Sequence, residues 1–304
     1  MGNEPWRRDC LGSSDAPAVA GVDPFRTAGD IWAEKTGRIP ASDSEENGTA
    51  ASLSPLSLGS VIGPLLVGYA GRVLNRPVAG EVWYRHPTAP LACSVDGISL
   101  DEPGVLIEAK TTGIIAPVPP QYAHAYGDDG TDEVPESVTV QVHHAFAVLD
   151  AQPNMPPIRQ ALVPVLIGGR GVRCYRLERD DKLVRDLVDL ETAWWEEYVQ
   201  KDVCPPQDPP SLATLKRFER RPAAPPVPLD PVYVAEFLHA KETEKQAVTN
   251  KEYLQRLVLA QLGDGEVGEC EIEGVLYRLT YKANPRVGYY VEPTTVRTLR
   301  ISKK

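Results

Sequence analysis

The sequence predicts an α/β fold in which a central mixed sheet is flanked by helices, followed by a small C-terminal α+β region. Three observations support this prediction. Up to residue 203, segments with the two-residue alternation of strands are interleaved with amphipathic helical segments. A proline-rich stretch at 204–231 predicts an interdomain linker. Residues 232–304 then combine a long helical segment with alternating, β-branched sequence.

The first elements of the chain are short helices and a loop. Ser14 or Asp15 can cap a helix that runs through residue 20, and Thr27 can open a helix that runs through residue 34. Residues 41–57 are small and polar and predict a flexible loop. Residues 59–75 are apolar at helical spacing and predict the next helix.

Strands and longer helices follow up to the linker. The expected order is strands at 81–85, 91–99 and 105–110, a helix at 137–149, strands at 162–167 and 172–177, and a helix at 180–199. The TVQV start of the 137–149 segment also fits a strand. After the linker, 232–262 predicts a helix, and 269–281 and 288–300 predict a small antiparallel sheet.

The bulk composition is that of a globular protein with a real core, at 42% hydrophobic and 24% charged residues. No apolar run is long enough to span a bilayer, and the N-terminus lacks the hydrophobic stretch of a secretory signal. The five cysteines are scattered and form no CxxC pair, which argues against a disulfide framework and a structural zinc site. A reducing cytoplasm is therefore the predicted location.

The net charge of −10 argues mildly against a nucleic-acid partner, since many such proteins carry a basic surface. It does not exclude one, because bound metal ions offset carboxylate charge. Arg7, Arg8, Arg26, Lys35 and Arg38 make the N-terminal segment locally basic. They are either part of a DNA-binding surface or ordinary solvated charges.

The residues that suggest chemistry lie on two neighbouring strands. One expected strand leads into Asp96 and a glycine, and the next ends with Glu108 and Lys110. Successive strand residues point to opposite faces, so Glu108 and Lys110 share a face. A Glu and a Lys on a buried strand are costly unless they are paired or bind a metal. Asp96, at a turn, can reach across to Glu108.

This set is suited to hydrolysis of a phosphodiester bond. Two carboxylates and a backbone carbonyl are the hard oxygen ligands that Mg²⁺ prefers. The metal polarises the phosphate and lowers the pKa of a bound water, and a neighbouring lysine stabilises the developing charge. A bare Asp…Glu-x-Lys pattern also arises on ordinary strands, so the surrounding residues must decide between the two interpretations.

The surrounding motifs resemble the YqaJ-like viral recombinase family, which belongs with the phage lambda exonuclease group and its PD-(D/E)xK nuclease core. The resemblance covers about residues 7–207, and its motifs occur in the family's order. They are LGSSD at 11–15, GVDPFRT at 21–27, WAEKTG at 32–37, HP at 86–87, SVDG at 94–97, EAK at 108–110, QVH at 141–143, WW at 194–195 and CPP at 204–206.

The resemblance implies the catalytic residues and the cofactor. Asp96 and Glu108 match the family's metal-binding carboxylates, and the backbone carbonyl of Ala109 is expected to be a further metal ligand. Lys110 matches the catalytic lysine, and Gln141 matches an active-site glutamine on the helix after the strand. The implied cofactor is Mg²⁺ or Mn²⁺.

The resemblance also implies a binding site for a terminal 5′-phosphate. Arg7, Ser14 and Ser94 match the positions that hold it in enzymes of this group, with Arg8 as the alternative to Arg7. An arginine fork and hydroxyl groups are physically suited to bind a phosphate.

Two positions depart from the family pattern. The family usually has a Glu near the metals at the helix position that Gly63 occupies here, and its absence puts metal occupancy or rate in doubt. The second Gln of the family's QxQ motif is His143, which either lines the site or faces solvent. We interpret the adjacent His144 as a structural residue.

These observations predict a metal-dependent deoxyribonuclease, a 5′→3′ exonuclease on linear double-stranded DNA that acts in phage-type recombination in a bacterial host cell. The resemblance implies DNA ends and a single-strand annealing protein as partners, and a ring-shaped homotrimer. An endonuclease on the same core is one alternative; an iron–sulfur nuclease is disfavoured by the scattered cysteines. A DNA-end-binding or scaffold protein with a weakened site is the non-enzyme alternative, favoured by Gly63.

Overall fold

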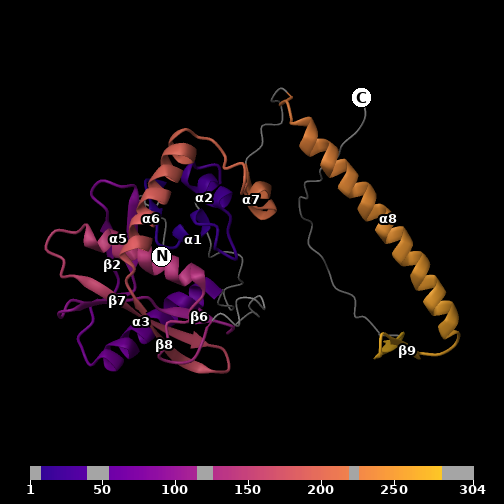
Figure 1. Ribbon diagram of the computed structural model, residues 1–304, viewed down its shortest axis with the longest axis horizontal. Coiled ribbons are helices and arrows are strands. Elements are labelled where there is room, and N and C mark those ends of the chain that lie inside the picture. Colours follow the sequence, from indigo (N-terminus) through magenta and orange to yellow (C-terminus); the bar gives the residue numbers. More distant parts are fainter. Residues whose placement is uncertain (1–7, 40–54, 115–125, 219–225, 283–304) are drawn as a thin grey trace. The chain divides into compact units, whose positions relative to one another are not determined.

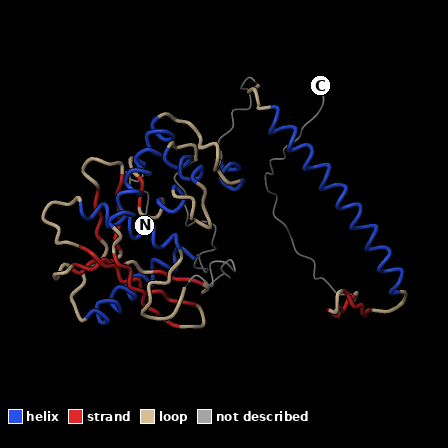
Figure 2. The backbone as a smooth tube through the Cα atoms, viewed as in Figure 1, coloured by secondary structure: helices blue, strands red, loops and turns tan. Residues whose placement is uncertain are grey.

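The computed structural model describes residues 8–39, 55–114, 126–218 and 226–282 (Figure 1). Arg7 and the second predicted C-terminal strand, at 288–300, lie outside the described residues. The chain divides into an N-terminal unit, Met1–Arg220, and a C-terminal unit, Arg221–Lys304. The N-terminal unit contains the buried core, and the described C-terminal unit consists of one helix and one hairpin (Figure 2).

The strands described in the N-terminal unit form two sheets. The three-stranded sheet has the order β1-β3-β2, and the five-stranded sheet has the order β4-β5-β7-β6, with β8 also paired to β7. Strands β1 and β3 are parallel, as are β5 and β6 with β7, while the other pairs are antiparallel. The strands are β1 (Leu11–Gly12), β2 (Val82–Arg85), β3 (Leu91–Val95), β4 (Gly97–Ser99), β5 (Gly104–Ile107), β6 (Lys110–Thr112), β7 (Ile158–Ile167) and β8 (Gly171–Glu178). The predicted mixed sheet is confirmed.

Two of the predicted strands are interrupted. The segment predicted as one strand at 91–99 breaks at Asp96, where the chain leaves β3 in the first sheet and enters β4 in the second. The segment predicted at 105–110 breaks at Glu108 and Ala109, between β5 and β6. Both breaks fall at candidate site residues, and their backbone groups are therefore partly free of the sheet ladders.

The helices of this unit agree with the predicted order. Thr27 caps α2 through a capping box with Asp30, as the sequence predicts. The strand alternative for TVQV is wrong, because α5 buries apolar residues along most of its length. The helices are α1 (Ala16–Val19), α2 (Ala28–Lys35), α3 (Pro55–Leu74), α5 (Glu136–Asp150), α6 (Asp181–Trp194), the π-helical turn η2 (Trp195–Gln200) and α7 (Leu212–Arg217).

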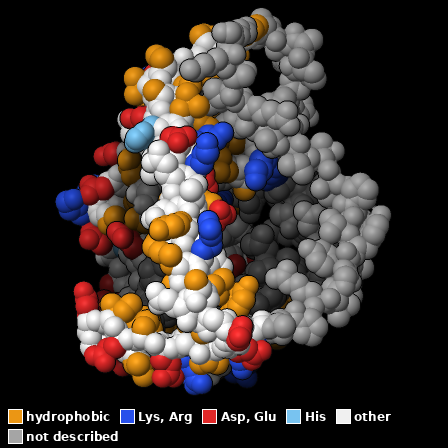
Figure 3. Space-filling view, turned by 90° about the vertical axis from the view of Figure 1, so that its right-hand side faces the viewer, with side chains coloured by type: hydrophobic (Ala, Val, Ile, Leu, Met, Phe, Trp, Pro, Cys, Tyr) orange, Lys and Arg blue, Asp and Glu red, His pale blue; other side chains and the backbone are white. Residues whose placement is uncertain are grey.

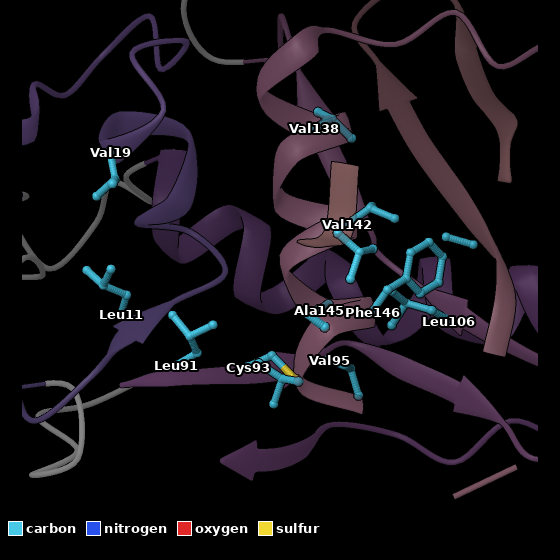
Figure 4. Packing of buried hydrophobic residues seen from close by; sticks show 14 of the residues in the cluster. Leu11, Val19, Leu91, Cys93, Val95, Leu106, Val138, Val142, Ala145 and Phe146 are labelled. Atoms are coloured by element: carbon cyan, nitrogen blue, oxygen red, sulfur yellow. The ribbon is translucent and has the colours of Figure 1, made fainter. Parts of the chain in front are cut away.

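Helices cover both faces of the five-stranded sheet. Val67 and Ala70 of α3 pack with Val105 and Ile107 of β5. On the opposite face, α5 packs on a larger cluster that includes Leu106 of the same strand. Figure 4 shows Val138, Val142, Ala145 and Phe146 of α5 in this cluster with residues of β3 and Leu106. Because neighbouring β5 residues face opposite helices, Glu108 must point toward α5, as Leu106 does.

A buried ion network fixes the turn that follows β1. Asp15 accepts a hydrogen bond from the backbone of Gly12 at 3.0 Å and pairs with Lys35 at 2.6 Å and with Arg26 at 3.2 Å. Although burial opposes ionisation, these two cations hold the pKa of Asp15 well below its usual range. Asp15 therefore stands before α1 without capping it through its side chain. Lys35 and Arg26, which the sequence offers as part of a basic surface, are committed to this network.

The predicted linker is partly folded onto the N-terminal unit. Asp208 accepts hydrogen bonds from the first two backbone N–H groups of α2, and Ser211 N–H donates to Asp30 at 2.8 Å. Ser211 then caps α7, which lies entirely within the segment predicted as linker. Asp208 thereby satisfies two backbone donors at the N-terminus of α2, and Asp30 satisfies the backbone donor of Ser211 in the proline-rich segment.

The C-terminal unit contains α8 (Pro231–Leu262) and the antiparallel pair β9 (Val267–Ile272) and β10 (Val275–Thr280). The segment 269–281, predicted as part of a small antiparallel sheet, contributes to both strands of a hairpin, because Glu273 and Gly274 both adopt positive φ and close a two-residue turn. No residue of α8 is buried, and Figure 3 shows hydrophobic and charged side chains mixed over its surface. Among the described helices, none is sufficiently long and apolar to cross a membrane.

Candidate active site

The candidate site is built around the two strand breaks. Gly97 pairs with Ile107 in the antiparallel β4–β5 ladder, so Asp96 and Glu108 flank the same end of this ladder. Glu108 keeps one sheet contact, its N–H donating to Leu162 of β7 at 3.2 Å. The N–H of Ala109 instead donates to Asp96 Oδ2 at 2.8 Å. This bond joins the two segments directly and confirms that Asp96 lies beside the Glu108 strand end.

Glu108, Lys110 and Gln141 form one hydrogen-bonded cluster. Lys110 Nζ donates to Glu108 Oε1 at 2.5 Å and to Gln141 Oε1 at 2.9 Å. Gln141 Nε2 donates to the same Glu108 oxygen at 2.6 Å. The two-residue spacing of Glu108 and Lys110 places both on the face that α5 covers, and Gln141 reaches them from the second turn of that helix. Each of the three side chains is thereby held by the other two.

The electrostatics of the site favour a bound cation. Burial and the neighbouring Glu108 carboxylate raise the pKa of Asp96 to about 7, although Lys110 and the Ala109 N–H act in the opposite direction. Burial and the charge of Glu108 also raise the pKa of Cys93, so that thiol stays protonated. The single positive charge of Lys110 does not neutralise the two neighbouring carboxylates, and a divalent cation would supply the missing positive charge.

The donor chemistry of these residues fits Mg²⁺ or Mn²⁺. In the described residues, Asp96 Oδ1 and Glu108 Oε2 receive no hydrogen bond, so one oxygen of each carboxylate is available as a ligand. The carbonyl of Ala109 is the third candidate oxygen. No group of three or more His, Cys, Asp or Glu side chains in the described chain is arranged to hold a metal. A metal here would therefore rely on two carboxylates, the backbone and water.

Comparison with known proteins identifies the N-terminal region. Residues 4–152 match the YqaJ-like viral recombinase domain, a range that includes all the residues of the site described above. The N-terminal unit contains a YqaJ-like viral recombinase domain. Its core of a mixed sheet between helices carries Asp96, Glu108 and Lys110 in the predicted order.

One relative matches well beyond the YqaJ-like domain. The protein described as "Uncharacterized protein YqaJ" from Bacillus subtilis (strain 168) is 28% identical over 278 residues, which are 88% of this chain and 81% of the relative. The match is longer than the N-terminal unit, so it extends into the C-terminal unit. The two units therefore occur together in this relative as well.

Solved structures with some similarity include an alkaline exonuclease (LHK-Exo) from Laribacter hongkongensis, at 17% identity, covering 66% of this chain and 94% of that one, with a TM-score of 0.42. A phage-related exonuclease from Haemophilus somnus 129PT is 10% identical, covering 64% of this chain and 96% of that one, with a TM-score of 0.39.

The two serines predicted for phosphate binding lie at the same end of the three-stranded sheet. Strands β1 and β3 run parallel, with Gly12 opposite Ala92, and both lead toward the Ser94–Asp96 end of β3. Ser14 is exposed in the turn that follows β1. Ser94 is two residues before Asp96, which directly follows β3, so the alternation of the strand puts Ser94 on the side of the carboxylate site.

Glu81 is a residue of this site that sequence reasoning missed. It is exposed, and Ser94 Oγ donates a hydrogen bond to its Oε1 at 3.2 Å. Val82 pairs with Val95 in the β2–β3 ladder, so Glu81 stands opposite Asp96. The only signal in the sequence was its place at the start of a strand, and the register of that strand against β3 could not be known.

Gly63 lies on α3 with open space around it. A Cβ placed on this glycine would meet no heavy atom within 4 Å. Close packing therefore does not explain the absence of the family's Glu at this position of the YqaJ-like domain.

His143 and His144 are both buried, so the alternative that His143 faces solvent is wrong. The partners of its ring are Thr139 and Asp180, and neither is a residue of the candidate site. His143 Nδ1 lies 2.8 Å from the Thr139 carbonyl, and its Nε2 accepts from Asp180 N–H at 3.0 Å, which requires a neutral ring. His144 contacts two acceptors, Glu191 at 2.6 Å and the Ala92 carbonyl at 2.9 Å, which requires a doubly protonated ring. His144 thus joins α5 to β3 and α6, in agreement with its predicted structural role.

Proposed function

We propose that this protein is a divalent-metal-dependent DNA exonuclease. The observation that carries the proposal is the Glu108–Lys110–Gln141 cluster beside Asp96 at the two strand breaks. A structural ion pair would need neither the glutamine that bridges both partners nor a second carboxylate with a raised pKa. The matching recombinase domain and the exonucleases among similar proteins are consistent with it.

Asp96, Glu108 and the Ala109 carbonyl are the residues that would hold Mg²⁺ or Mn²⁺. When bound, the ion would polarise the scissile phosphate and make a water molecule more acidic. Lys110 lies against Glu108 with its side chain 23% exposed, and its amine can donate to the attacking water and to the phosphate oxygens as negative charge develops. Gln141 holds the lysine amine and the Glu108 carboxylate in fixed relative positions.

The proposed substrate is the end of a linear DNA duplex, degraded from the 5′ terminus. Among the described residues, Ser94 and Ser14 are the candidate contacts for a terminal 5′-phosphate. Arg7, which lies outside the described residues, is the third candidate. A single-strand annealing protein as partner, a homotrimer as the assembly and a cytoplasmic location in a bacterial host remain proposals that rest on the family resemblance.

A DNA-end-binding protein with little hydrolytic activity is the second candidate. Gly63 favours it, because the α3 position beside the sheet offers room for a carboxylate but provides none. The intact cluster around Lys110 favours the enzyme instead.

Incubation of an end-labelled linear duplex with Mg²⁺ or Mn²⁺ tests the choice between the two. The exonuclease releases labelled mononucleotides or short products in a metal-dependent way, and a chelator stops the reaction. A closed circular duplex of the same sequence should remain intact. Cleavage of the circle would indicate an endonuclease, and binding without any cleavage would support the end-binding protein.

A further inference from the structure

The β2–β3 ribbon presents a carboxylate to a hydroxyl at the rim of the candidate site. Trp83 pairs with Ser94, and the next position of the ladder sets Glu81 opposite Asp96. Alternation along the strands places Glu81, Trp83, Ser94 and Asp96 on one face. The opposite face of β2 carries Val82, which packs on the core. The face with Glu81 is therefore the one that a DNA end would approach.

The hydrogen bond between Ser94 and Glu81 determines what the serine can offer a ligand. Ser94 Oγ donates its single hydrogen to Glu81 Oε1 at 3.2 Å. A serine hydroxyl has one donor, so in this arrangement its lone pairs are what remain. Phosphate oxygens are acceptors and need a donor. The bond to Glu81 must therefore break before Ser94 can bind a phosphate.

The negative charge of Glu81 also disfavours binding of a phosphate. Its carboxylate is close enough to Asp96 for the two charges to interact. A 5′-terminal phosphate carries close to two negative charges at neutral pH, whereas a 5′-hydroxyl carries none. Repulsion from Glu81 thus falls on the phosphorylated end and leaves the hydroxylated end unaffected. Because Glu81 is exposed, salt should weaken this repulsion.

We propose that Glu81 sets the end preference of this protein by competing with the terminal 5′-phosphate of DNA for the Ser94 hydroxyl. This inference rests on the proposed function in assuming that a DNA end reaches this face and that Ser94 contacts its 5′-phosphate. Glu81 is a specificity-determining residue in this account. It lowers the affinity for phosphorylated ends and makes 5′-phosphorylated and 5′-hydroxyl ends more nearly equal substrates.

The test measures binding without cleavage, so it does not depend on nuclease activity. A DNA hairpin with one open end and a fluorophore in its loop is prepared with a 5′-phosphate or a 5′-hydroxyl. Fluorescence anisotropy in the presence of a chelator gives the Kd of the full-length protein for each form. The proteins are wild type, Glu81→Gln, the double variant Glu81→Gln/Ser94→Ala, and Glu178→Gln. Glu178 is the matched control, a strand carboxylate on β8 that accepts a cross-strand bond from Gln160 at 2.6 Å.

Glu81→Gln is expected to tighten binding of the phosphorylated hairpin by about three- to tenfold and to leave the hydroxylated hairpin nearly unchanged. Adding Ser94→Ala should remove most of that gain, and Glu178→Gln should change neither Kd. An equal change for both ends would overturn the proposal, as would no change for either. A fall in Mn²⁺ affinity of Glu81→Gln with an unchanged end preference would also overturn it and would make Glu81 a metal-site carboxylate. Absence of DNA cleavage by wild type would count against the proposed function alone.

Discussion

The two sides of the candidate site differ in how completely the fold assembles them. On one side, Glu108, Lys110 and Gln141 are already bound to one another, from a strand and a helix that share the buried core. On the other side, Ser14 is exposed on a turn and the hydroxyl of Ser94 is directed to Glu81. The first side is preorganised for chemistry, whereas the second must rearrange when it binds a ligand. Changes on the first side should therefore have the larger effects.

The largest expected effect is loss of cleavage in Lys110→Ala. Removing a charge that acts mainly in the transition state should lower kcat by about 10²–10⁴-fold and leave DNA affinity nearly unchanged. Cleavage of a labelled linear duplex and anisotropy measure the two quantities. Lys182→Ala is the matched control, since Lys182 is an exposed lysine paired with Asp186 at 2.5 Å on α6. Wild-type turnover in Lys110→Ala would remove the lysine from the site.

The buried ion pair between His144 of α5 and Glu191 of α6 should have the next largest effect. His144→Gln leaves the buried Glu191 carboxylate without its cation, at a cost of about 3–5 kcal/mol of unfolding free energy. His143→Gln, which alters a neutral ring, should cost only about 1–2 kcal/mol. Urea unfolding measures both, and equal losses would contradict the assignment of a charged ring to His144.

The pH dependence of this pair has a definite sign. Burial alone disfavours the charged ring, but Glu191 and the Ala92 carbonyl together raise the pKa of His144 above its usual value. The stability from the pair is complete below about pH 6.5, the pKa in the unfolded chain, and is lost as pH rises through the raised value. The difference between wild type and His144→Gln should shrink over that range.

Asp96→Ala should weaken Mn²⁺ binding by about tenfold or more and leave the metal-free protein at least as stable as wild type. Because the pKa of Asp96 is raised to about 7, the folded metal-free protein holds a proton that the unfolded chain releases near pH 4. As the pH rises from about 4 to about 7, the stability of the metal-free wild type should therefore decrease and its affinity for Mn²⁺ should increase. Calorimetric titration at several pH values measures the affinity. Unchanged affinity in Asp96→Ala would exclude Asp96 as a ligand.

On the less assembled side, Ser94→Ala should have a small effect. In wild type the hydroxyl already donates to Glu81, so its loss should reduce any advantage of 5′-phosphorylated over 5′-hydroxyl ends by less than about threefold. Competition between the two ends in one cleavage reaction measures this ratio. A much larger loss would mean that Ser94 is preorganised for phosphate and that the two sides do not differ as described.

The smallest effect is expected from Gly63→Glu. The helix has room for the side chain, and replacing a glycine within a helix contributes about 0.5 kcal/mol of stability. If the new carboxylate reaches the site, Mn²⁺ affinity should rise about two- to threefold. Thermal unfolding measures the change in stability, and calorimetry measures the change in Mn²⁺ affinity. A loss of stability would show that α3 tolerates no side chain there.

The same contrast explains what could be predicted from the sequence. Glu108 and Lys110 are two residues apart in one predicted strand, so their shared face followed from local geometry alone. The turn after the preceding strand indicated Asp96, and the family motifs added Gln141. Glu81 could not be found, because its position depends on the register of β2 against β3. The buried contacts of Lys35 and of the two histidines likewise depend on partners that are distant in the sequence.

The predicted ends of two strands and the predicted linker were wrong for a related reason. The breaks at Asp96 and Glu108 interrupt segments whose alternation continues through them, so only the change of sheet partner reveals them. The proline-rich segment was predicted as linker from composition, but Asp208 and Ser211 attach it to α2 by hydrogen bonds that composition does not encode.

One measurement tests the central claim most directly: release of nucleotides from a uniformly labelled linear duplex by wild type and Lys110→Ala, with Mg²⁺, with Mn²⁺ and with chelator. The account predicts release by wild type with either metal, none with chelator, and at most about 1% of the wild-type rate from Lys110→Ala. Equal release by wild type and Lys110→Ala, or release that persists in chelator, would contradict a metal-dependent site centred on Asp96, Glu108 and Lys110.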